Sequence, residues 1–482
     1  MVFSSIIFLF YFLPLFLAAY LCLAPWRAAV IVAGSLLFYA WGEPAYIALL
    51  LVFIVLNWAM GLAVQRATSL RRPILAAGIT ANLLFLIFFK YVGFLCAQFD
   101  ALLRLTGAAS LPHIAVPLPL GISFFTFQGI SYLIDISRGD VAAQPSLLKF
   151  AMYKAMFPQL IAGPIVRYRQ IAGEIDDRSV SIARLRRGIE IFVLGLAQKV
   201  LIANTVSLPA DQIFALPADQ LTTGTAWLGA VCYMAQIFFD FSGYTNMAIG
   251  LGQMMGFTLP RNFDRPYLAQ SVTEFWRRWH MTLSSWFRDY LYIPLGGSRH
   301  GPARTYANLL AVFVLCGLWH GASWTFALWG LYHGAFLIAE RAARPLASVR
   351  IWRPLRHFYL LLAVLVGWVL FRADSLGAAA GMLKAMVGLG AAGPAAMPAA
   401  RFATASVITA LLAALVAVIA PPLGAWRRWA RGIPAFGPSG GGAIASAAAV
   451  DGMRIAWSLS LFLLTATALS AGTYNPFIYF RF

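Results

Sequence analysis

Long apolar runs, interrupted by short loops rich in arginine, set the pattern of this 482-residue chain. A helix that crosses a bilayer needs about 20 predominantly apolar residues, so the pattern predicts about ten to twelve spans, some of them re-entrant. The candidate segments are 5–24, 28–41, 45–65, 74–96, 116–136, 146–166, 187–206, 222–252, 306–321, 323–340, 357–372, 402–424 and 453–471.

The segment 261–305 departs from this pattern because it combines arginines with many aromatic residues. Placed on a helix, residues 271–292 carry their large apolar side chains on one face by i, i+4, i+7 spacing. That face holds Phe275, Trp279, Leu283, Trp286, Phe287 and Tyr290, and the other holds Arg277, Arg278, Ser284, Ser285 and Arg288. We expect an amphipathic helix in the headgroup region, with aromatics toward lipid and arginines toward water. An ordinary surface helix satisfies the same pattern but leaves Glu274, His280 and Asp289 unexplained.

Composition supports a polytopic membrane protein. The chain is 61% hydrophobic and 11% charged, whereas soluble domains carry roughly a quarter charged residues. Its 36 Lys and Arg against 17 Asp and Glu give a net charge of +19. The basic residues gather in loops at 66–72, 167–187, 341–357 and 425–431, which marks these loops as cytoplasmic and argues against nucleic-acid binding. Such loops also suit anionic lipid or a phosphorylated donor.

We expect one membrane-embedded domain over 1–482, with an all-α architecture. Residues 432–450, rich in Gly, Ala, Ser and Pro, are interpreted as a flexible loop. The four cysteines each lie in an apolar stretch without a C-x-x-C pair, which favours buried apolar roles. The first apolar run lacks a basic n-region and an A-x-A site, so a retained span is expected.

His320 is the strongest candidate for chemistry. It lies within residues 305–339, a stretch without Asp, Glu, Lys or Arg. Apolar surroundings favour a neutral imidazole, which can accept a proton from an attacking hydroxyl. Ionisable groups at membrane depth are functional hypotheses by default. A structural histidine bonded to a neighbouring helix is the open alternative.

Three further histidines lie close to His320 in sequence. His280 follows the aromatic stripe and is expected to turn toward the protein interior, whereas His300 is expected in a solvated loop and His333 in helix packing. No metal site is predicted, because no H-E-x-x-H pair or cysteine cluster is present. A serine nucleophile in G-x-S-x-G is also missing.

Other polar and aromatic residues complete the candidate site. Asp240 is a second charge at membrane depth that would orient a histidine or cap a helix, and Tyr244 and Asn246 would extend a polar lining. Arg277 and Arg278 suit bidentate contacts with a donor's phosphates, with lipid headgroups as the alternative. The tryptophans nearest the histidines join the candidate binding set: Trp276, Trp279 and Trp319. Residues 157–164, with two prolines and a glycine, predict a broken helix, which is tolerated at membrane depth only beside protein or a cavity.

The motifs of this chain resemble those of the membrane-bound O-acyltransferase (MBOAT) superfamily, within it the bacterial alginate O-acetyltransferase branch. The resemblance covers nearly the whole length, and the polysaccharide is less well specified than the superfamily. It rests on Met1–Ser5, Pro119–Phe124, Phe157–Pro164, Phe239–Tyr244, Met247–Gly252, Glu274–Tyr292, Gly317–Gly321 and Asn475–Phe482.

The resemblance implies a ring of tilted helices around a central funnel, with His320 as the essential histidine and His280 as the second active-site histidine. It implies an acyl group, most simply acetyl from acetyl-CoA or another cytoplasmic thioester, and no permanently bound cofactor. The group would cross the bacterial inner membrane to a periplasmic SGNH-type acetyltransferase or similar acceptor, working with a polysaccharide synthesis and export complex. The polymer would be alginate, cellulose, peptidoglycan or a related polymer.

Two rival interpretations belong to other classes. A transporter or flippase of a lipid-linked sugar or small solute would also use a polar cavity and broken helices, although the chain shows no paired inverted repeats. An inert scaffold of an export complex would tolerate single histidine substitutions.

Overall fold

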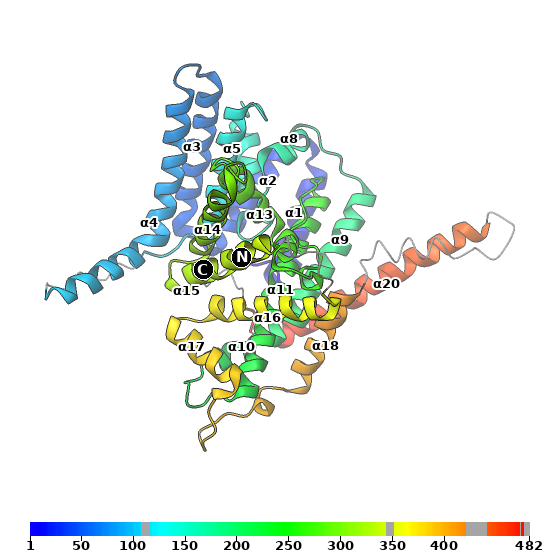
Figure 1. Ribbon diagram of the computed structural model, residues 1–482. Coiled ribbons are helices and arrows are strands. Elements are labelled where there is room, and N and C mark those ends of the chain that lie inside the picture. Colours follow the sequence, from blue (N-terminus) through cyan, green and yellow to red (C-terminus); the bar gives the residue numbers. More distant parts are fainter. Residues whose placement is uncertain (108–115, 344–350, 421–440, 473, 477–482) are drawn as a thin grey trace.

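The computed structural model describes the chain except residues 108–115, 344–350, 421–440, 473 and 477–482. Within those described residues the regular structure is helical, apart from one isolated bridge between Leu221 and Met397 (Figure 1). The α-helices are α1 (Leu13–Cys22), α2 (Arg27–Gly42), α3 (Ile47–Arg66), α4 (Arg71–Leu105), α5 (Ile122–Arg138), α6 (Leu147–Ala155), α7 (Phe157–Leu160), α8 (Tyr168–Asp176), α9 (Ile182–Ala197), α10 (Asn204–Phe214), α11 (Thr223–Met254), α12 (Val272–Arg278), α13 (Met281–Phe287), α14 (Gly301–His320), α15 (Trp324–Ala342), α16 (Arg353–Arg372), α17 (Leu376–Lys384), α18 (Ala405–Ile419) and α20 (Gly441–Ala471). Short π-helical turns are η1 (Phe8–Phe12), η4 (Gln198–Ala203), η6 (Arg288–Tyr292) and η8 (Ala385–Leu389), and 3-10 turns are η2 (Ala24–Trp26), η3 (Pro44–Tyr46), η5 (Pro266–Leu268) and η9 (Ala399–Arg401).

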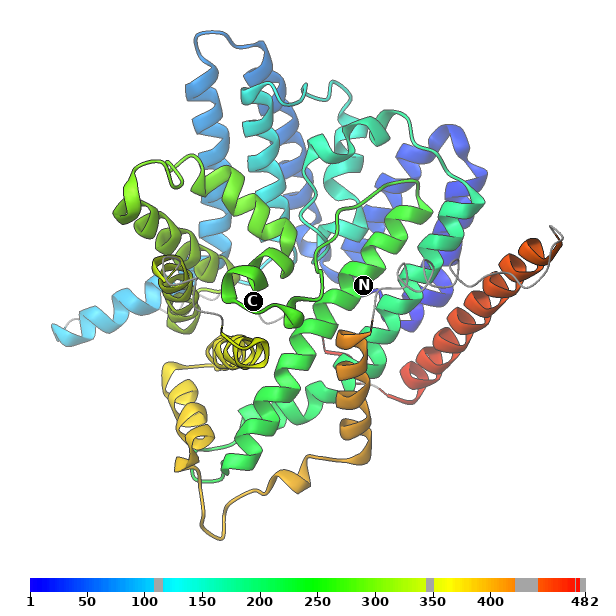
Figure 2. The same cartoon turned by 45° about the vertical axis from the view of Figure 1, so that its right-hand side comes forward.

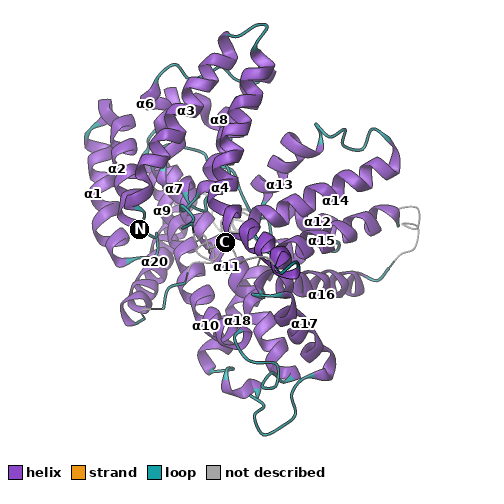
Figure 3. Cartoon of the chain, turned by 90° about the vertical axis from the view of Figure 1, so that its left-hand side faces the viewer, coloured by secondary structure: helices purple, strands orange, loops and turns teal. Residues whose placement is uncertain are grey.

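Seven helices in the described part of the chain are long and apolar enough to cross a membrane. Three shorter apolar helices, at Phe8–Cys22, Leu376–Leu389 and Ala405–Ile419, add to them. The predicted all-α polytopic class is therefore confirmed, while the total of ten to twelve spans stays a prediction. Helix α20 and the far end of α4 project away from the bundle (Figures 1 and 2). In Figure 3, α1, α2 and α6 lie on one side of α11 and α13 to α16 on the other.

The helix break expected within 157–164 is present. Helix α6 ends at Ala155, α7 is a single turn over Phe157–Leu160, and residues 161–167 are irregular. The backbone of this irregular stretch finds partners in the protein, because Ile165 N–H donates to Thr282 Oγ1 at 3.0 Å.

The segment 271–292 is not one surface helix, and its aromatic face does not turn toward lipid. The helix breaks between α12 and α13, where Trp279 is extended and His280 takes left-handed dihedral angles (φ 42°, ψ 54°). Backbone groups freed by the break bond to an adjacent extended stretch, Asp264 N–H to Arg278 C=O and Met281 N–H to Asn262 C=O, both at 2.9 Å. The whole apolar face predicted to contact lipid is buried in protein: Phe275, Trp279, Leu283, Trp286, Phe287 and Tyr290. A face that packs on protein has the same period as one that packs on lipid, which is why the pattern misled.

The predicted loop at 432–450 is corrected at its second part. Residues 441–450 form the first three turns of α20, whereas 432–440 lie outside the described residues. Alanine, the strongest helix former, is the commonest residue in 441–450 and outweighs the two glycines that begin it.

Glycines allow two helix pairs to touch backbone to backbone. A Cβ at Gly195 of α9 would stand 2.5 Å from the carbonyl oxygen of Gly243 in α11. In the α14–α15 hairpin, a Cβ at Gly317 would stand 2.2 Å from Phe326 O, and one at Gly330 would stand 2.3 Å from Phe313 O. Small residues at such crossings are the usual means of close packing between membrane helices.

Gly317→Ala is expected to lower stability by about 1–3 kcal/mol, because α14 must move away from α15 to admit the methyl group. Thermal unfolding of purified protein in detergent measures this. Gly452→Ala in α20 is the matched control, since a Cβ there meets no atom within 4 Å. Equal melting temperatures for the two variants would contradict the tight crossing.

Hydrogen bonds join residues from the beginning, the middle and the last part of the chain. Asn475 Nδ2 donates to Ser4 C=O at 3.0 Å, and Asn204 Nδ2 donates to Asn475 Oδ1 at 3.1 Å. Lys199 Nζ donates to Pro476 C=O. Asn475 and Pro476 thus connect the beginning of the chain to η4 and α10.

Candidate active site

His320 is the last residue of α14, at the point where the chain turns back into α15. The helix ends there because Gly321 is extended (φ −162°, ψ 149°), and a Cβ at Gly321 would stand 2.1 Å from the Phe326 ring. Aromatic rings enclose the imidazole, with centroids of Trp319 at 4.8 Å, Phe371 at 5.1 Å and Trp329 at 5.4 Å. The residue as a whole is 8% exposed.

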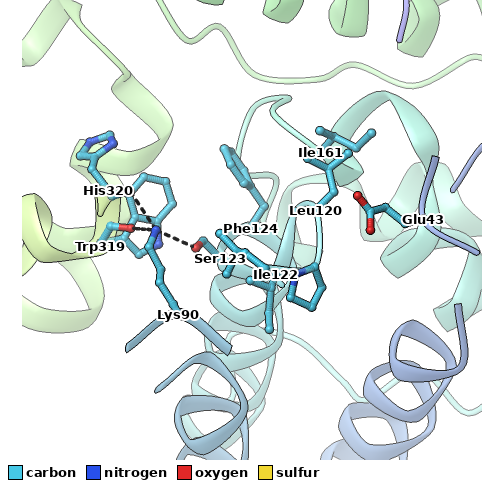
Figure 4. Close-up of a pocket in the computed structure, with 12 residues that line it drawn as sticks. Glu43, Lys90, Leu120, Ile122, Ser123, Phe124, Ile161, Trp319 and His320 are labelled. Carbon is cyan, nitrogen blue, oxygen red and sulfur yellow. Dashed lines mark hydrogen bonds between the residues drawn. The ribbon is translucent and has the colours of Figure 1, made fainter. Parts of the chain in front are cut away.

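A cavity of about 160 Å³ adjoins this helix end (Figure 4). Residues 118–124 line it together with Glu43, Lys90, Ile161, Trp319 and His320. Glu43 lies on the turn between α2 and α3, where partial burial raises the pKa of its carboxyl. His320 is therefore one of the residues that line a cavity, and the other lining side chains include an acid, an amine and a hydroxyl.

His280, like His320, lies near the Trp319 ring. Its ring centroid is 6.2 Å from that of Trp319 and 4.7 Å from that of Phe241. The ring points inward, as predicted, and is 1% exposed. Burial lowers the pKa of His280 to about 3, so the ring is neutral at physiological pH. Its left-handed backbone is strained for a residue with a side chain, by about 1–3 kcal/mol.

Asn262 fixes the orientation of His280. Asn262 Oδ1 lies 3.0 Å from His280 Nδ1 and also accepts from Thr282 N–H at 3.2 Å and Thr282 Oγ1 at 2.9 Å. The contact makes Nδ1 the protonated nitrogen, which leaves Nε2 as the acceptor. Within the described residues, Nε2 has no hydrogen-bond partner.

Asn262→Ala is expected to reduce the rate of the expected acyl transfer about 10-fold, because the His280 ring loses the hydrogen bond that fixes its orientation. Steady-state assays of detergent-purified protein measure this. Thr282→Val removes a neighbouring polar group of the same cluster without touching the ring, and should keep more activity. If Thr282→Val loses more activity than Asn262→Ala, Asn262 does not act through His280.

An aromatic column links α13 to the end of α14. The Trp286 and Phe127 rings are stacked at 3.7 Å with planes 8° apart, and Phe127 stacks on Trp319 at 5.4 Å. Trp286 Nε1 donates to Phe127 C=O at 3.0 Å. The column packs against the Trp319 ring, whose centroid is 4.8 Å from that of His320 and 6.2 Å from that of His280.

The remaining predicted site residues lie elsewhere. Asp240 forms a buried ion pair with Lys199 at 2.8 Å, and the expected roles of orienting a histidine or capping a helix stay predictions. Tyr244 stacks on Phe3 at 4.5 Å, and Asn246 Nδ2 donates to Gln198 Oε1 at 2.8 Å. These three residues of α11 are not among those that line the cavity, so their role in binding stays a prediction.

The predicted site residues of the segment 271–292 also lie away from the cavity lining. Trp276 Nε1 donates to His333 Nδ1 at 3.4 Å, so His333 serves helix packing, and Trp279 stacks on Phe275 at 5.5 Å. Arg278 pairs with Glu274 at 2.6 Å, whereas Arg277 is exposed. His300 is exposed, as predicted for a loop residue. Neither arginine lines the cavity, and phosphate binding by them stays a prediction.

Sequence reasoning missed Lys90, which lies on the cavity wall within α4 (Figure 4). The signal was present, since Lys90 follows seven consecutive apolar residues, 83–89, in a membrane-spanning segment. Its ammonium donates to the carbonyl oxygens of Trp319 and His320.

The chain is similar in sequence to a known protein family and to several individual proteins. The sequence model of the membrane-bound O-acyltransferase family matches residues 122–376, from α5 to the start of α17, a stretch that includes both histidines. The chain is 41% identical over 501 aligned positions to the probable alginate O-acetylase of Azotobacter vinelandii, covering 100% of each chain. It is 35% identical to the peptidoglycan O-acetyltransferase of Helicobacter pylori over 81% of this chain and 80% of that protein. It is 29% identical to the teichoic acid D-alanyltransferase of Bacillus subtilis over 53% and 67%, respectively.

Proposed function

The chain belongs to the membrane-bound O-acyltransferase family and is a multi-pass membrane O-acyltransferase, and from this premise we propose that it serves the O-acetylation of an exported polysaccharide such as alginate. The donor is acetyl-CoA or another acyl thioester on the cytoplasmic side of the bacterial inner membrane. The identity of 41% over full length to a probable alginate O-acetylase supports acetyl and alginate over the D-alanyl group and teichoic acid of the more distant relative.

The observation that carries the proposal is the position of His320 on a cavity at the end of a membrane-embedded helix. In the proposed reaction the neutral imidazole accepts the proton of an acceptor hydroxyl as the hydroxyl oxygen attacks the thioester carbonyl. The new O–C bond forms and the C–S bond breaks. The proton then passes from the imidazolium to the leaving thiolate, so the enzyme ends unchanged. His280, neutral and fixed by Asn262, is the candidate for holding donor or acceptor beside Trp319.

The placement of the cavity supports an acceptor that arrives from the side opposite the basic loops. Glu43 lies on the α2–α3 turn, and the far end of α3 leads into the arginine-rich loop at 66–72, which the positive-inside rule makes cytoplasmic. The proposed acceptor is a periplasmic SGNH-type acetyltransferase or similar protein that passes the acetyl group to the polymer, within a polysaccharide synthesis and export complex.

Purified protein in lipid nanodiscs, supplied with acetyl-CoA labelled in the acetyl group, tests the proposal. Release of free CoA with transfer of label to a hydroxyl acceptor is expected, and empty nanodiscs give the background. No acetyl-CoA binding and no thioester turnover, combined with transport of a lipid-linked sugar by vesicles containing the protein, would overturn it in favour of a transporter.

A further inference from the structure

The C-terminal end of α14 is held by side chains from a helix far away in sequence. The last carbonyls of a helix have no partner within it. Here Tyr91 Oη donates to Leu318 C=O at 2.5 Å, and Lys90 Nζ donates to the carbonyl oxygens of Trp319 and, at 2.9 Å, His320. Two adjacent residues of α4 therefore satisfy the three carbonyls that end at His320.

The setting of Lys90 explains how a cation is accommodated at this depth. Its third donor points to Ser123 Oγ at 3.5 Å, and the ammonium lies 5.8 Å from the centroid of the Trp319 ring. In the described part of the chain Lys90 makes no ion pair with a carboxylate. The negative end of the α14 dipole and the face of the Trp319 ring stabilise the ammonium charge instead.

Figure 4 shows from which side Lys90 approaches. The ammonium meets the main chain of Trp319 and His320, while the His320 ring is turned away from it. Lys90 therefore contacts the peptide groups that carry the imidazole rather than the imidazole itself. Its three donors are all engaged by protein, which leaves none for a substrate.

Two fully buried lysines show that this arrangement is particular to Lys90, which is partly buried. Lys154 donates to Phe125 C=O, and Lys199 pairs with Asp240. Neither lines the cavity, whereas Lys90 does. Lys90 also lies outside the stretch 122–376 that the family model matches.

We propose that Lys90 is a positioning residue, whose ammonium anchors the end of α14 and so sets the orientation of His320 at the cavity. The proposal rests on the acyl transfer proposed above. Unanchored, the terminal turn of α14 frays and the imidazole loses its fixed place relative to the reacting hydroxyl. A displacement of about 1 Å reduces an enzymatic rate up to about 10²-fold.

Lys90→Met, which keeps length but removes the charge and donors, is expected to lower kcat for acetyl transfer at least about 10-fold. The KM for acetyl-CoA should change less than about 2-fold, because Lys90 has no donor free for substrate. Lys90→Arg, with charge and N–H donors retained, should recover part of kcat. Lys149→Met, which removes an exposed lysine paired with Asp176, is the control and should match the parent.

A double variant separates positioning from general stabilisation. Combined with His320→Gln, Lys90→Met should cause no further loss, because its effect passes through the imidazole. Multiplying losses, a raised KM with unchanged kcat, or failure of Lys90→Arg to recover activity would each overturn the proposal.

Chemical labelling gives a readout that does not require activity. The rate at which diethyl pyrocarbonate modifies His320, followed by mass spectrometry, should change in Lys90→Met and not in Lys149→Met. An unchanged rate overturns the positioning role. If the parent protein shows no thioester turnover, the proposed function fails instead, and the labelling result still decides whether Lys90 orients His320.

Discussion

Replacing His320 with glutamine is expected to lower the rate of acetyl transfer by about 10²- to 10⁴-fold. Glutamine is polar and similar in length, but it neither accepts the hydroxyl proton nor returns a proton to the leaving thiolate. The substitution should leave the fold intact, because His320 is the last residue of α14 and Lys90 bonds to its main-chain carbonyl rather than to its ring. Release of CoA under single-turnover conditions, with protein amount in the membrane measured in parallel, gives the effect.

His300→Gln is the matched control for this experiment. His300 is exposed in the loop before α14, so the same chemical change there should leave the rate unaltered. Acetyl transfer at the parent rate by His320→Gln would remove the general base from the mechanism. It would then leave the inert-scaffold interpretation as the better account.

Asp240→Asn is expected to destabilise the protein by about 3–5 kcal/mol, because it leaves the buried Lys199 ammonium without its counter-charge. The two side chains are 2.8 Å apart, and only 3% of Lys199 and 2% of Asp240 is exposed. Lys199 keeps its hydrogen bond to Pro476 C=O, which does not neutralise a charge. Denaturant unfolding in detergent, followed by tryptophan fluorescence, measures the loss.

The paired variant Lys199→Met with Asp240→Leu tests the cause. Removing both charges together should restore most of the stability, since apolar residues of similar volume often replace a buried ion pair without loss. If the paired variant unfolds as readily as Asp240→Asn, the carboxylate matters for another reason. That result would favour the role in donor or acceptor binding that the sequence suggested for Asp240.

Apolar runs predicted the helices well because length and hydropathy are local properties of the sequence. The break within 157–164 was also predictable, since proline and glycine disrupt a helix wherever they lie. His320 was found for the same local reason, as an isolated ionisable group in an apolar stretch. The pairing of His320 with His280 was expected from the resemblance alone, and in the structure both rings lie near that of Trp319.

Contacts between distant segments could not be predicted in this way. Lys90 and the carbonyl of His320 are 230 positions apart, and nothing near His320 in sequence points to α4. Asp240 was recognised as a charge at membrane depth, but its ion pair with Lys199, which lies in a segment counted as apolar, could not be predicted from the sequence. The aromatic stripe of 271–292 was recognised, but its period does not say whether lipid or protein covers it.

The meeting of Ser4 with Asn475 has a consequence for biogenesis. The two residues are 471 positions apart, so the ribosome delivers the first long before the second exists. Ser4 and Asn204 therefore lack these hydrogen-bond partners until Asn475 has been synthesised. The contacts that join the first residues of the chain to α10 through Asn475 therefore form only after nearly the whole chain has been translated.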